Sequence, residues 1–420
     1  MNRRIVHVPR RFTAQDWGGT ETVILETARR QQAEGADPVI LTSMALAAEK
    51  SEVIGGIPVK RFRHVYPFFG LSAADKAALD LKGGNLLSLP LFYGLWREPD
   101  VRLFHAHTLK RLGGTVRTVA RLRKKPYVVS LHGGVFDVPA AERGDLARPV
   151  EGKFEWGRPF GALLGARRVL QEADHVICVG QSEAEKAAAE LNHGRVSYLP
   201  NGVDSARFTQ GDGAGFRREN GIPENAFLLL AMGRIDAQKN QLGLLEAFLK
   251  FHAKVPEARL LILGPVTQPA YAEKLHEFIR ANHLTDSARI LPGLPNHSPA
   301  LVDAFHAADV FVLASRHEPF GIVVLEAWCA GCAAVVSRVG GLRALVRENE
   351  TGLMFDPGAA DAADQLAACL FRLHADPAAR RALGEAGKAE ALAHYDWSRI
   401  SARLENVYRQ AEENCRSRLK

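Results

Sequence analysis

The residues that could do chemistry gather in short loops that follow apolar, β-branched runs. One such loop follows Phe227–Met232 and reads Gly233-Arg234-Ile235-Asp236-Ala237-Gln238-Lys239. The forked guanidinium of Arg234 and the point charge of Lys239 together suit a diphosphate. An ordinary solvated basic loop is the alternative for this pair taken alone.

A second loop follows the run Val310–Ala314 and carries two carboxylates. Glu318 lies in the loop itself, and Glu326 lies further along, inside an otherwise apolar helical pattern. A carboxylate among apolar neighbours is costly unless a partner satisfies it, and sugar hydroxyls are suitable partners. A structural ion pair is the alternative for Glu326.

Two strand-to-helix turns could hold phosphate oxygens. Gly18 and Gly19 precede one helical pattern, and Pro319 favours a second helix start. Backbone N–H groups at a helix start are free to meet an anion, and the helix dipole favours negative charge there. Around Gly18 the spacing is not G-x-G-x-x-G, so the dinucleotide fingerprint is absent. At the second start the N–H groups belong to Phe320, Gly321 and Ile322.

Histidines follow two of the apolar runs. His132 comes directly after Tyr127–Leu131, where it could hydrogen-bond an oxygen or act as an acid or base, or simply be structural. His105 and His107 would share one face of a strand, but no carboxylate or third histidine is adjacent in sequence. Cys329 and Cys332 have metal-ligand spacing without a second pair. We therefore expect no metal.

The order of these runs predicts an α/β fold. Apolar, β-branched runs alternate with helical patterns twice, with the turn-rich segment Leu199–Asp204 between the two series. Repeated strand–helix–strand units make parallel, doubly wound sheets, whose ligands bind beyond the carboxyl ends of the strands. We expect domains 1–200 and 201–396 to face each other across a cleft.

Taken together, the motifs resemble the retaining glycosyltransferases of family four, which have the GT-B fold. The resemblance runs in order along nearly the whole chain and weakens between residues 63 and 100, where acceptors are usually recognised. Ala314 replaces a proline that is frequent in the family, and we expect little consequence. Ala36 replaces a common histidine at a position that is not catalytic. The matching pieces are Gly18-Gly19-Thr20-Glu21, His132-Gly133, Pro200-Asn201-Gly202-Val203-Asp204, Gly233-Arg234 with Lys239, Glu318 with Glu326, and Gly340-Gly341 before Glu348.

The resemblance implies a role for each matching residue in binding a nucleotide-diphosphate sugar. Arg234 and Lys239 would neutralise the leaving diphosphate, and the turns at Gly18–Gly19 and Phe320–Ile322 would cradle it. The carboxylates of Glu318 and Glu326 would bind the sugar and the ribose. The remaining implied contacts are His132 beside the reacting sugar, Asn201 in the donor site, the base pocket at Pro265, Gly293 and Leu294, and a helix from about residue 397 to 420 that returns to the first domain.

The formal net charge is +7, and the basic excess lies in the first 200 residues. At helical spacing Arg117, Arg121 and Lys124 share a face of the segment Lys110–Lys125. Such a face suggests an anionic membrane or a diphosphate-lipid acceptor, with a plain solvated face as the alternative. No nucleic-acid-binding motif accompanies it.

We therefore expect a metal-independent retaining hexosyltransferase that uses UDP- or GDP-hexose and no cofactor. The acceptor would be a glycan or a lipid-linked sugar, in polysaccharide, lipopolysaccharide or glycolipid biosynthesis. The alternatives are a sugar phosphorylase, a nucleotide-sugar epimerase, or a non-catalytic nucleotide-sugar-binding subunit. Five cysteines and the lack of a long apolar run favour a cytoplasmic protein, with peripheral contact at the inner face of the membrane.

Overall fold

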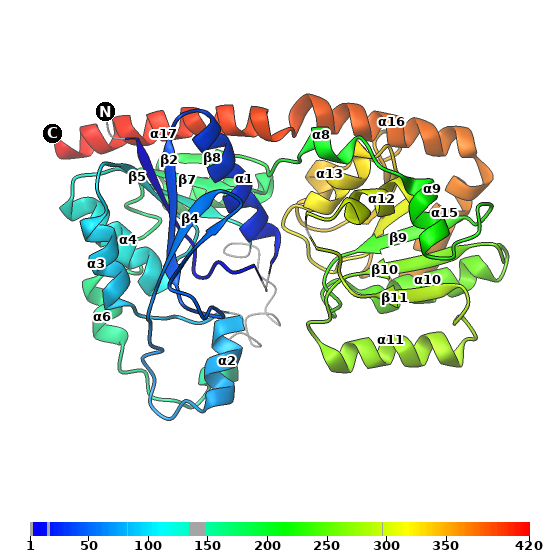
Figure 1. Ribbon diagram of the computed structural model, residues 1–420, viewed down its shortest axis with the longest axis horizontal. Helices are drawn as coiled ribbons and strands as arrows, with labels where there is room; N and C mark the ends of the chain where they lie inside the picture. Colours follow the sequence, from blue (N-terminus) through cyan, green and yellow to red (C-terminus); the bar gives the residue numbers. More distant parts are fainter. Residues whose placement is uncertain (1–2, 15–16, 82, 134–147, 296) are drawn as a thin grey trace. The chain divides into compact units, whose positions relative to one another are not determined.

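A computed structural model describes residues 3–14, 17–81, 83–133, 148–295 and 297–420 (Figure 1). The contacts divide the chain into two compact units. The first contains Met1–Pro200 and Trp397–Lys420, and the second contains Asn201–Asp396. The division falls in the turn-rich segment where the sequence predicts it.

The first unit is built on one eight-stranded sheet of order β3-β4-β2-β1-β5-β6-β7-β8. Its neighbouring strands are parallel, except that β3 is antiparallel to β4. The central strands are buried on both faces, which explains their unbroken apolar runs. The strands are β1 Arg4–Val8, β2 Asp37–Ser43, β3 Ser51–Ile54, β4 Ile57–Phe62, β5 Val101–Ala106, β6 Tyr127–Leu131, β7 His175–Cys178 and β8 Val196–Tyr198.

The short strand β3 does not stand out in the sequence as an apolar run. Its residues are alternately half-buried and exposed, so it lacks an apolar run. Gly55 and Gly56, both with positive φ, turn it back onto β4. Two consecutive residues with positive φ are the mark of a tight hairpin, and this glycine pair was the available signal.

Helices cover the first sheet and include the C-terminal segment. They are α1 Gly19–Ala33, α2 Ala73–Leu81, α3 Leu89–Arg97, α4 Lys110–Leu122, η1 Arg148–Val150, α6 Arg158–Leu163, α7 Gln181–Leu191 and α17 Trp397–Leu419. α17 contacts α1, β6 and β7 (Figure 1). Arg102 of β5 holds it through Glu405 and Glu412, each at 2.7 Å. The return of this helix to the first domain follows the expectation.

The second unit has a six-stranded parallel sheet of order β11-β10-β9-β12-β13-β14. The strands are β9 Leu228–Met232, β10 Arg259–Leu263, β11 Ala288–Leu291, β12 Val310–Leu313, β13 Ala333–Ser337 and β14 Leu353–Phe355. The helices are α8 Ser205–Phe208, α9 Gly213–Glu219, α10 Gln241–His252, α11 Pro269–Ala281, α12 Pro299–Ala307, α13 Ile322–Cys329, α14 Leu342–Leu345, α15 Ala362–Ala375 and α16 Pro377–His394.

Candidate active site

The strand order of the second unit fixes where a ligand can bind. Chain order runs outward from β9 through β10 to β11, and then resumes on the other side of β9 with β12. Loops that leave β9 and β12 therefore diverge, and in doubly wound sheets ligands bind at the carboxyl ends of the two strands where this happens. The loop with Arg234 and Lys239 follows β9, and the loop with Glu318 follows β12. The two predicted motifs thus meet at the topological switch point.

Lys239 and Glu318 form an ion pair at this point. The Lys239 Nζ lies 2.6 Å from Glu318 Oε2, and both side chains are largely buried. The Ser315 hydroxyl donates to the same carboxylate oxygen at 3.2 Å. The same Glu318 oxygen thus accepts from both Lys239 and Ser315. A ligand with phosphates and hydroxyls could take over from the ion pair, because a phosphate could pair with Lys239 and a hydroxyl could donate to Glu318.

Arg234 is the more exposed cation, with 40% of its side chain accessible. Its guanidinium lies 3.2 Å from Asp236 and 3.4 Å from the Gln238 side-chain oxygen. Gln238 in turn donates to the His317 carbonyl at 3.1 Å, which ties the two loops together. The guanidinium therefore has N–H groups left over for an anionic ligand.

Glycines allow the loops around Glu318 to pack closely. A Cβ on Gly340 would lie 2.3 Å from the Glu318 carbonyl, and one on Gly341 would lie 2.0 Å from the Pro319 carbonyl. The Gly341 N–H also donates to the Glu318 carbonyl at 2.9 Å. The loop after β13 therefore supports the backbone on which Glu318 stands.

Helix α13 begins at Ile322, somewhat later than Pro319 suggests. Gly321 caps it in the left-handed region with φ of 97°. Glycine adopts this conformation without the strain that a side chain would cause there. The turn leaves the first N–H groups of the helix without partners inside the helix. Gly321 and Ile322 remain at the helix start, whereas Phe320 lies outside the helix and is buried.

Glu326 lies on α13 between buried Leu325 and Ala327. Burial raises the pKa of its carboxyl to about 7, and Arg207 lowers it only in part. Within the part of the chain that the structure describes, the carboxylate forms no hydrogen bond and no ion pair. A half-buried acceptor without a partner is suited to a ligand hydroxyl.

The predicted base pocket lies on the other side of β9. Pro265 follows β10, and its carbonyl accepts from the Ile235 N–H at 2.9 Å. A Cβ on Gly293 would lie 2.9 Å from Pro265 Cδ, so these two residues are adjacent, with Leu294 next in sequence. Asn201, the first residue of the second unit, is buried.

In the first unit Gly18 precedes α1, which begins at Gly19. The Glu21 carboxylate accepts from the Gly18 N–H at 3.1 Å, forming one half of a capping box. Burial raises the pKa of the Glu21 carboxyl, and Arg11 opposes the shift. Arg10 and Arg11, which follow β1, also act on this carboxylate. The Gly18 N–H is thus bonded to a carboxylate of the chain itself, and the phosphate contact of Gly18 and Gly19 stays a prediction.

His132 follows β6 and ends a row of three imidazoles. Its Nε2 lies 2.8 Å from Nδ1 of His107, whose Nε2 lies 3.0 Å from Nδ1 of His7. The far end is Nε2 of His7, 2.8 Å from the Gln31 side-chain oxygen. Sequence reasoning missed that His7 and Gln31 belong to the row that ends at His132. The signal was the His105-Ala106-His107 spacing beside a strand that holds His7.

His7, His105 and His107 are also close enough to ligate one cation, with ligand atoms within 4.8 Å of one another. Every one of their ring nitrogens already has a hydrogen-bond partner. His105 bonds the Tyr408 hydroxyl at 2.8 Å and the Ser130 hydroxyl at 2.7 Å. A metal would have to break several of these buried bonds, so the donor set fits hydrogen bonding better than ligation.

The predicted basic face on α4 needs one correction. Arg117 is buried, and its guanidinium donates to Glu172 at 2.6 Å and to the Leu164 carbonyl. A distant acidic partner draws it inward, which a helical wheel cannot show. Arg121 also pairs with Glu172, at 2.7 Å, but it stays exposed, as does Lys124.

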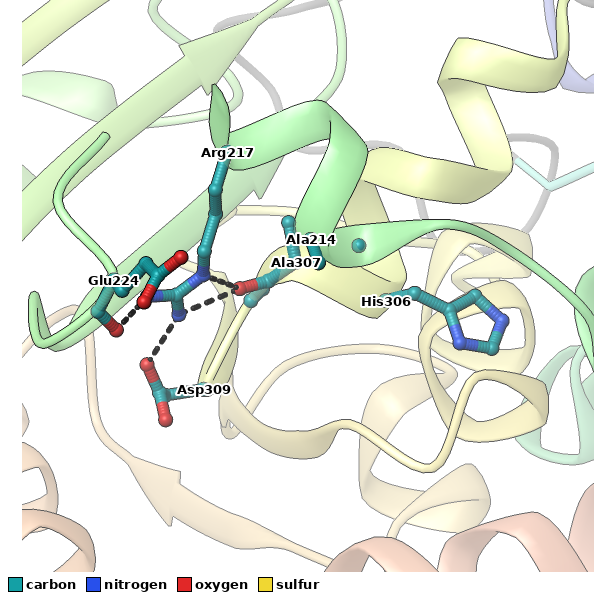
Figure 2. Close-up of a pocket in the computed structure, with 8 residues that line it drawn as sticks. Ala214, Arg217, Glu224, His306, Ala307 and Asp309 are labelled. Carbon is teal, nitrogen blue, oxygen red and sulfur yellow. Dashed lines mark hydrogen bonds and ion pairs between the residues drawn. The ribbon is translucent and has the colours of Figure 1, made fainter. Parts of the chain in front are cut away.

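A cavity of about 370 Å³ lies elsewhere in the second unit, beside Arg217 and Asp309 (Figure 2). Arg217 donates to the Ala307 carbonyl at 2.7 Å and to Asp309 at 2.9 Å. Asp309 precedes β12, so this cavity is at the amino-terminal edge of the sheet, away from the switch point. Its arginine is committed to holding backbone carbonyls in place.

Among the described residues, no helix combines the length and apolarity needed to cross a membrane.

Comparison with known proteins identifies the family of the chain. Residues 214–390 match the protein-family model "Glycosyl transferases group 1", and residues 18–202 match the family model "Glycosyl transferase 4-like domain". The chain is 31% identical over 418 residues to D-inositol 3-phosphate glycosyltransferase 1 of Catenulispora acidiphila, covering 96% of this chain and 93% of that protein. The chain belongs to the group 1 glycosyltransferases.

Solved structures show the same fold. Anabaena HepE, in complex with UDP and glucose, superposes with a TM-score of 0.72 at 18% identity over 96% of this chain and 98% of its own. Sucrose-phosphate synthase from Thermosynechococcus elongatus gives 0.70 at 20% identity over 97% and 99%. The two parallel-sheet units are therefore those of a GT-B glycosyltransferase.

Proposed function

We propose that the protein transfers a hexosyl unit from UDP-hexose to a hydroxyl of a phosphate-bearing acceptor, with retention at the anomeric carbon. The observation that carries the proposal is the meeting of Arg234, Lys239 and Glu318 at the switch point of the second unit. UDP as the leaving group is supported by the HepE complex, and GDP is an outcome of the test.

The leaving diphosphate gains negative charge in the transition state. Fixed cations at that point stabilise the transition state more than the ground state. In the proposed complex Lys239 moves from Glu318 to a phosphate oxygen, and the freed Glu318 carboxylate accepts a sugar hydroxyl. Arg234 and the first N–H groups of α13 complete the phosphate contacts, and Glu326 accepts from the ribose.

Two cations in the proposed phosphate site make a divalent metal unnecessary, so we propose metal-independent transfer. We assign no nucleophile, because Glu318 is engaged in sugar binding. Retention then requires that the acceptor hydroxyl attack from the face that the diphosphate leaves. We keep His132 as a proposed contact of the sugar.

We propose that the acceptor carries a phosphate. A cavity of about 140 Å³ in the first unit is lined by Arg10 and by Lys110, the first residue of α4. Burial and the neighbouring Arg10 both lower the pKa of Lys110, so an anion beside it would be stabilised. The name of the Catenulispora relative, which specifies D-inositol 3-phosphate, supports this class.

A lipid-linked acceptor in cell-surface glycan biosynthesis also carries phosphate groups, so it is included among the acceptors to be assayed. Peripheral membrane contact at the inner face is supported by exposed Phe69 and Phe154, whose rings stack at 5.9 Å, and by exposed Arg121 and Lys124. Binding to anionic vesicles that weakens with salt supports the membrane proposal, and salt-independent binding contradicts it.

Turnover with UDP-glucose and GDP-mannose tests the donor proposal, with D-inositol 3-phosphate and a lipid-linked diphosphate sugar as acceptors. Glu318→Gln and Lys239→Met should each reduce kcat at least about tenfold, the effect of one charge-assisted hydrogen bond. Glu277→Gln, exposed on α11, is the matched control. Equal rates in all four proteins contradict the proposal, as does full loss of activity in EDTA.

Lys110→Met tests the phosphate site separately from the donor site. The KM for the phosphorylated acceptor should rise about tenfold or more, because one charge-assisted contact is lost. Donor hydrolysis in the absence of acceptor should be unchanged. Lys50→Met, also in the first unit and exposed, is the control. An unchanged acceptor KM in Lys110→Met rejects the phosphate site.

A further inference from the structure

The imidazoles of His7, His107 and His132 form a row. Neighbouring rings are linked by an N···N hydrogen bond, and one proton lies in each of these bonds. His7 is completely buried and His132 is partly accessible, so the row runs from the interior to the surface of the unit. The rings of His107 and His132 stack with centroids 5.1 Å apart. No hydrogen bond within the described residues reaches Nδ1 of His132.

All three imidazoles are neutral near pH 7. Burial lowers the pKa of His7 and of His132 to about 4, and burial together with the neighbouring imidazoles also lowers the pKa of His107 well below its usual value. A neutral imidazole has one donor and one acceptor nitrogen. The proton position on one ring therefore dictates the position on the next.

The buried end of the row sets this direction. The Gln31 amide donates to the Tyr408 hydroxyl at 2.9 Å, so its oxygen faces His7 and can only accept. His7 must then carry its proton on Nε2, and its Nδ1 accepts from Nε2–H of His107. By the same step Nδ1 of His107 accepts from Nε2–H of His132.

A side branch agrees with this direction. The Tyr408 hydroxyl, which accepts from Gln31, donates to Nδ1 of His105, and Nε2–H of His105 donates to Ser130. All four histidines then hold the Nε2–H tautomer, the intrinsically favoured form of a neutral histidine. A flipped Gln31 amide would reverse every bond and place all four in the less favourable Nδ1–H form.

We propose that Gln31 and Tyr408 act as positioning residues which, through His7 and His107, hold His132 with its proton on Nε2 and its Nδ1 lone pair free. His132 then meets its ligand as a hydrogen-bond acceptor, which selects a hydroxyl at that position. The identity of this ligand as the donor sugar rests on the proposed function. The direction of the row does not depend on it.

NMR of the full-length protein with ¹⁵N-labelled histidine tests the direction. The His132 and His107 signals are assigned by their loss in His132→Gln and His107→Gln. We expect protons on Nε2 of both residues, and a coupling across the hydrogen bond between His132 Nε2 and His107 Nδ1. The coupling is the decisive signal, because an isolated imidazole also favours Nε2–H. A missing coupling, or a proton on Nδ1 of His132, overturns the proposal.

Variants of Gln31 test whether this distant residue sets the tautomer of His132. Gln31→Leu removes the acceptor, so the Nδ1–H form of His132 should become detectable and kcat should fall about five- to tenfold, the range of one hydrogen bond. Gln31→Glu can accept from both His7 and Tyr408, and it should keep the wild-type tautomer and coupling. The control is His175→Asn, a buried histidine that bonds Ser197 outside the row.

The outcomes separate this proposal from the proposed function. If the wild type shows the coupling and His132→Gln is fully active, the hydrogen-bonded row is confirmed and His132 has no role in transfer. Coupling absent with an inactive His132→Gln means that the donor site stands and the row does not. Stoichiometric zinc in the purified protein that disappears in His107→Gln overturns the hydrogen-bonded row in favour of ligation.

Discussion

Replacing Glu326 by glutamine distinguishes two effects of its carboxylate: the loss of folding stability caused by its burial, and the gain in ligand affinity that it provides. The pKa of Glu326 is raised by burial from 4.5 to about 7. The full shift is worth about 3.4 kcal/mol of unfolding free energy. The carboxyl is therefore a destabilising group in the ligand-free protein at neutral and alkaline pH.

The sign follows from proton binding. Between pH 4.5 and 7 the folded protein keeps the Glu326 proton while the unfolded chain loses it, so stability falls as pH rises through this window and is level above it. With these two pKa values the penalty is about 0.8 kcal/mol at pH 5 and about 3 kcal/mol at pH 8. Glutamine, which is always neutral, removes most of this penalty.

Urea unfolding of the full-length wild type and Glu326→Gln at pH 5 and pH 8 measures the effect. The variant should gain about 2–3 kcal/mol more at pH 8 than at pH 5. Glu277→Gln, which is exposed on α11, should stay within about 0.5 kcal/mol at both pH values. An equal effect of Glu326→Gln at the two pH values would refute the reasoning.

The same variant reports on the ligand. Ribose hydroxyls that donate to Glu326 favour the ionised carboxylate, so donor binding should release a proton below pH 7. Calorimetry in two buffers of different ionisation enthalpy detects this release in the wild type. It should vanish in Glu326→Gln, together with part of the affinity. An unchanged proton release in the variant would assign the proton to another group.

Three further outcomes follow from the contacts. Arg234→Ala should lower kcat/KM about 10- to 100-fold while leaving the melting temperature unchanged, because the guanidinium is 40% exposed and serves the ligand; a matching loss of stability would contradict this. Gly341→Ala should weaken donor binding in a thermal-shift assay, because its Cβ would meet a carbonyl at 2.0 Å, whereas Gly194→Ala, with open space, should bind normally. Arg102→Ala should lower the free energy of unfolding by about 1–3 kcal/mol in urea, since two carboxylates of α17 lose their partner; no change would show that apolar packing alone holds the helix.

The sheet of the second unit was predictable because its central strands are buried on both faces. Runs such as Arg259–Leu263 stand out in sequence for that reason, and they coincide with β10. The order of strands was not visible, yet a doubly wound sheet places functional loops at carboxyl ends whatever the order. Arg234, Lys239 and Glu318 could be found in this way.

Pairing between distant side chains could not be predicted. Helical spacing places Arg117 beside Arg121 on a basic face, but Glu172 draws the Arg117 side chain inward. The ion pair of Lys239 with Glu318 has the same character, since each residue was assigned a ligand contact of its own. The spacing of residues indicates which of them share a face of one helix or strand. It does not indicate which hydrogen-bond or ion-pair partners another element provides.

The row of histidines shows how far a local pattern can reach. The spacing of His105, in β5, and His107, directly after it, predicts that both side chains share one face. The register of β1 places His7 opposite His105 on the same face. The anchor of the row was beyond sequence reasoning, because Gln31 comes from α1 and Tyr408 from α17. A helix predicted only to brace the first unit thus supplies the hydroxyl that orients Gln31. Shortening the chain before α17 would remove that hydroxyl and the packing of the helix together. The substitution Tyr408→Phe instead isolates the hydroxyl, since the ring stays and only the hydrogen bonds to Gln31 and His105 are lost.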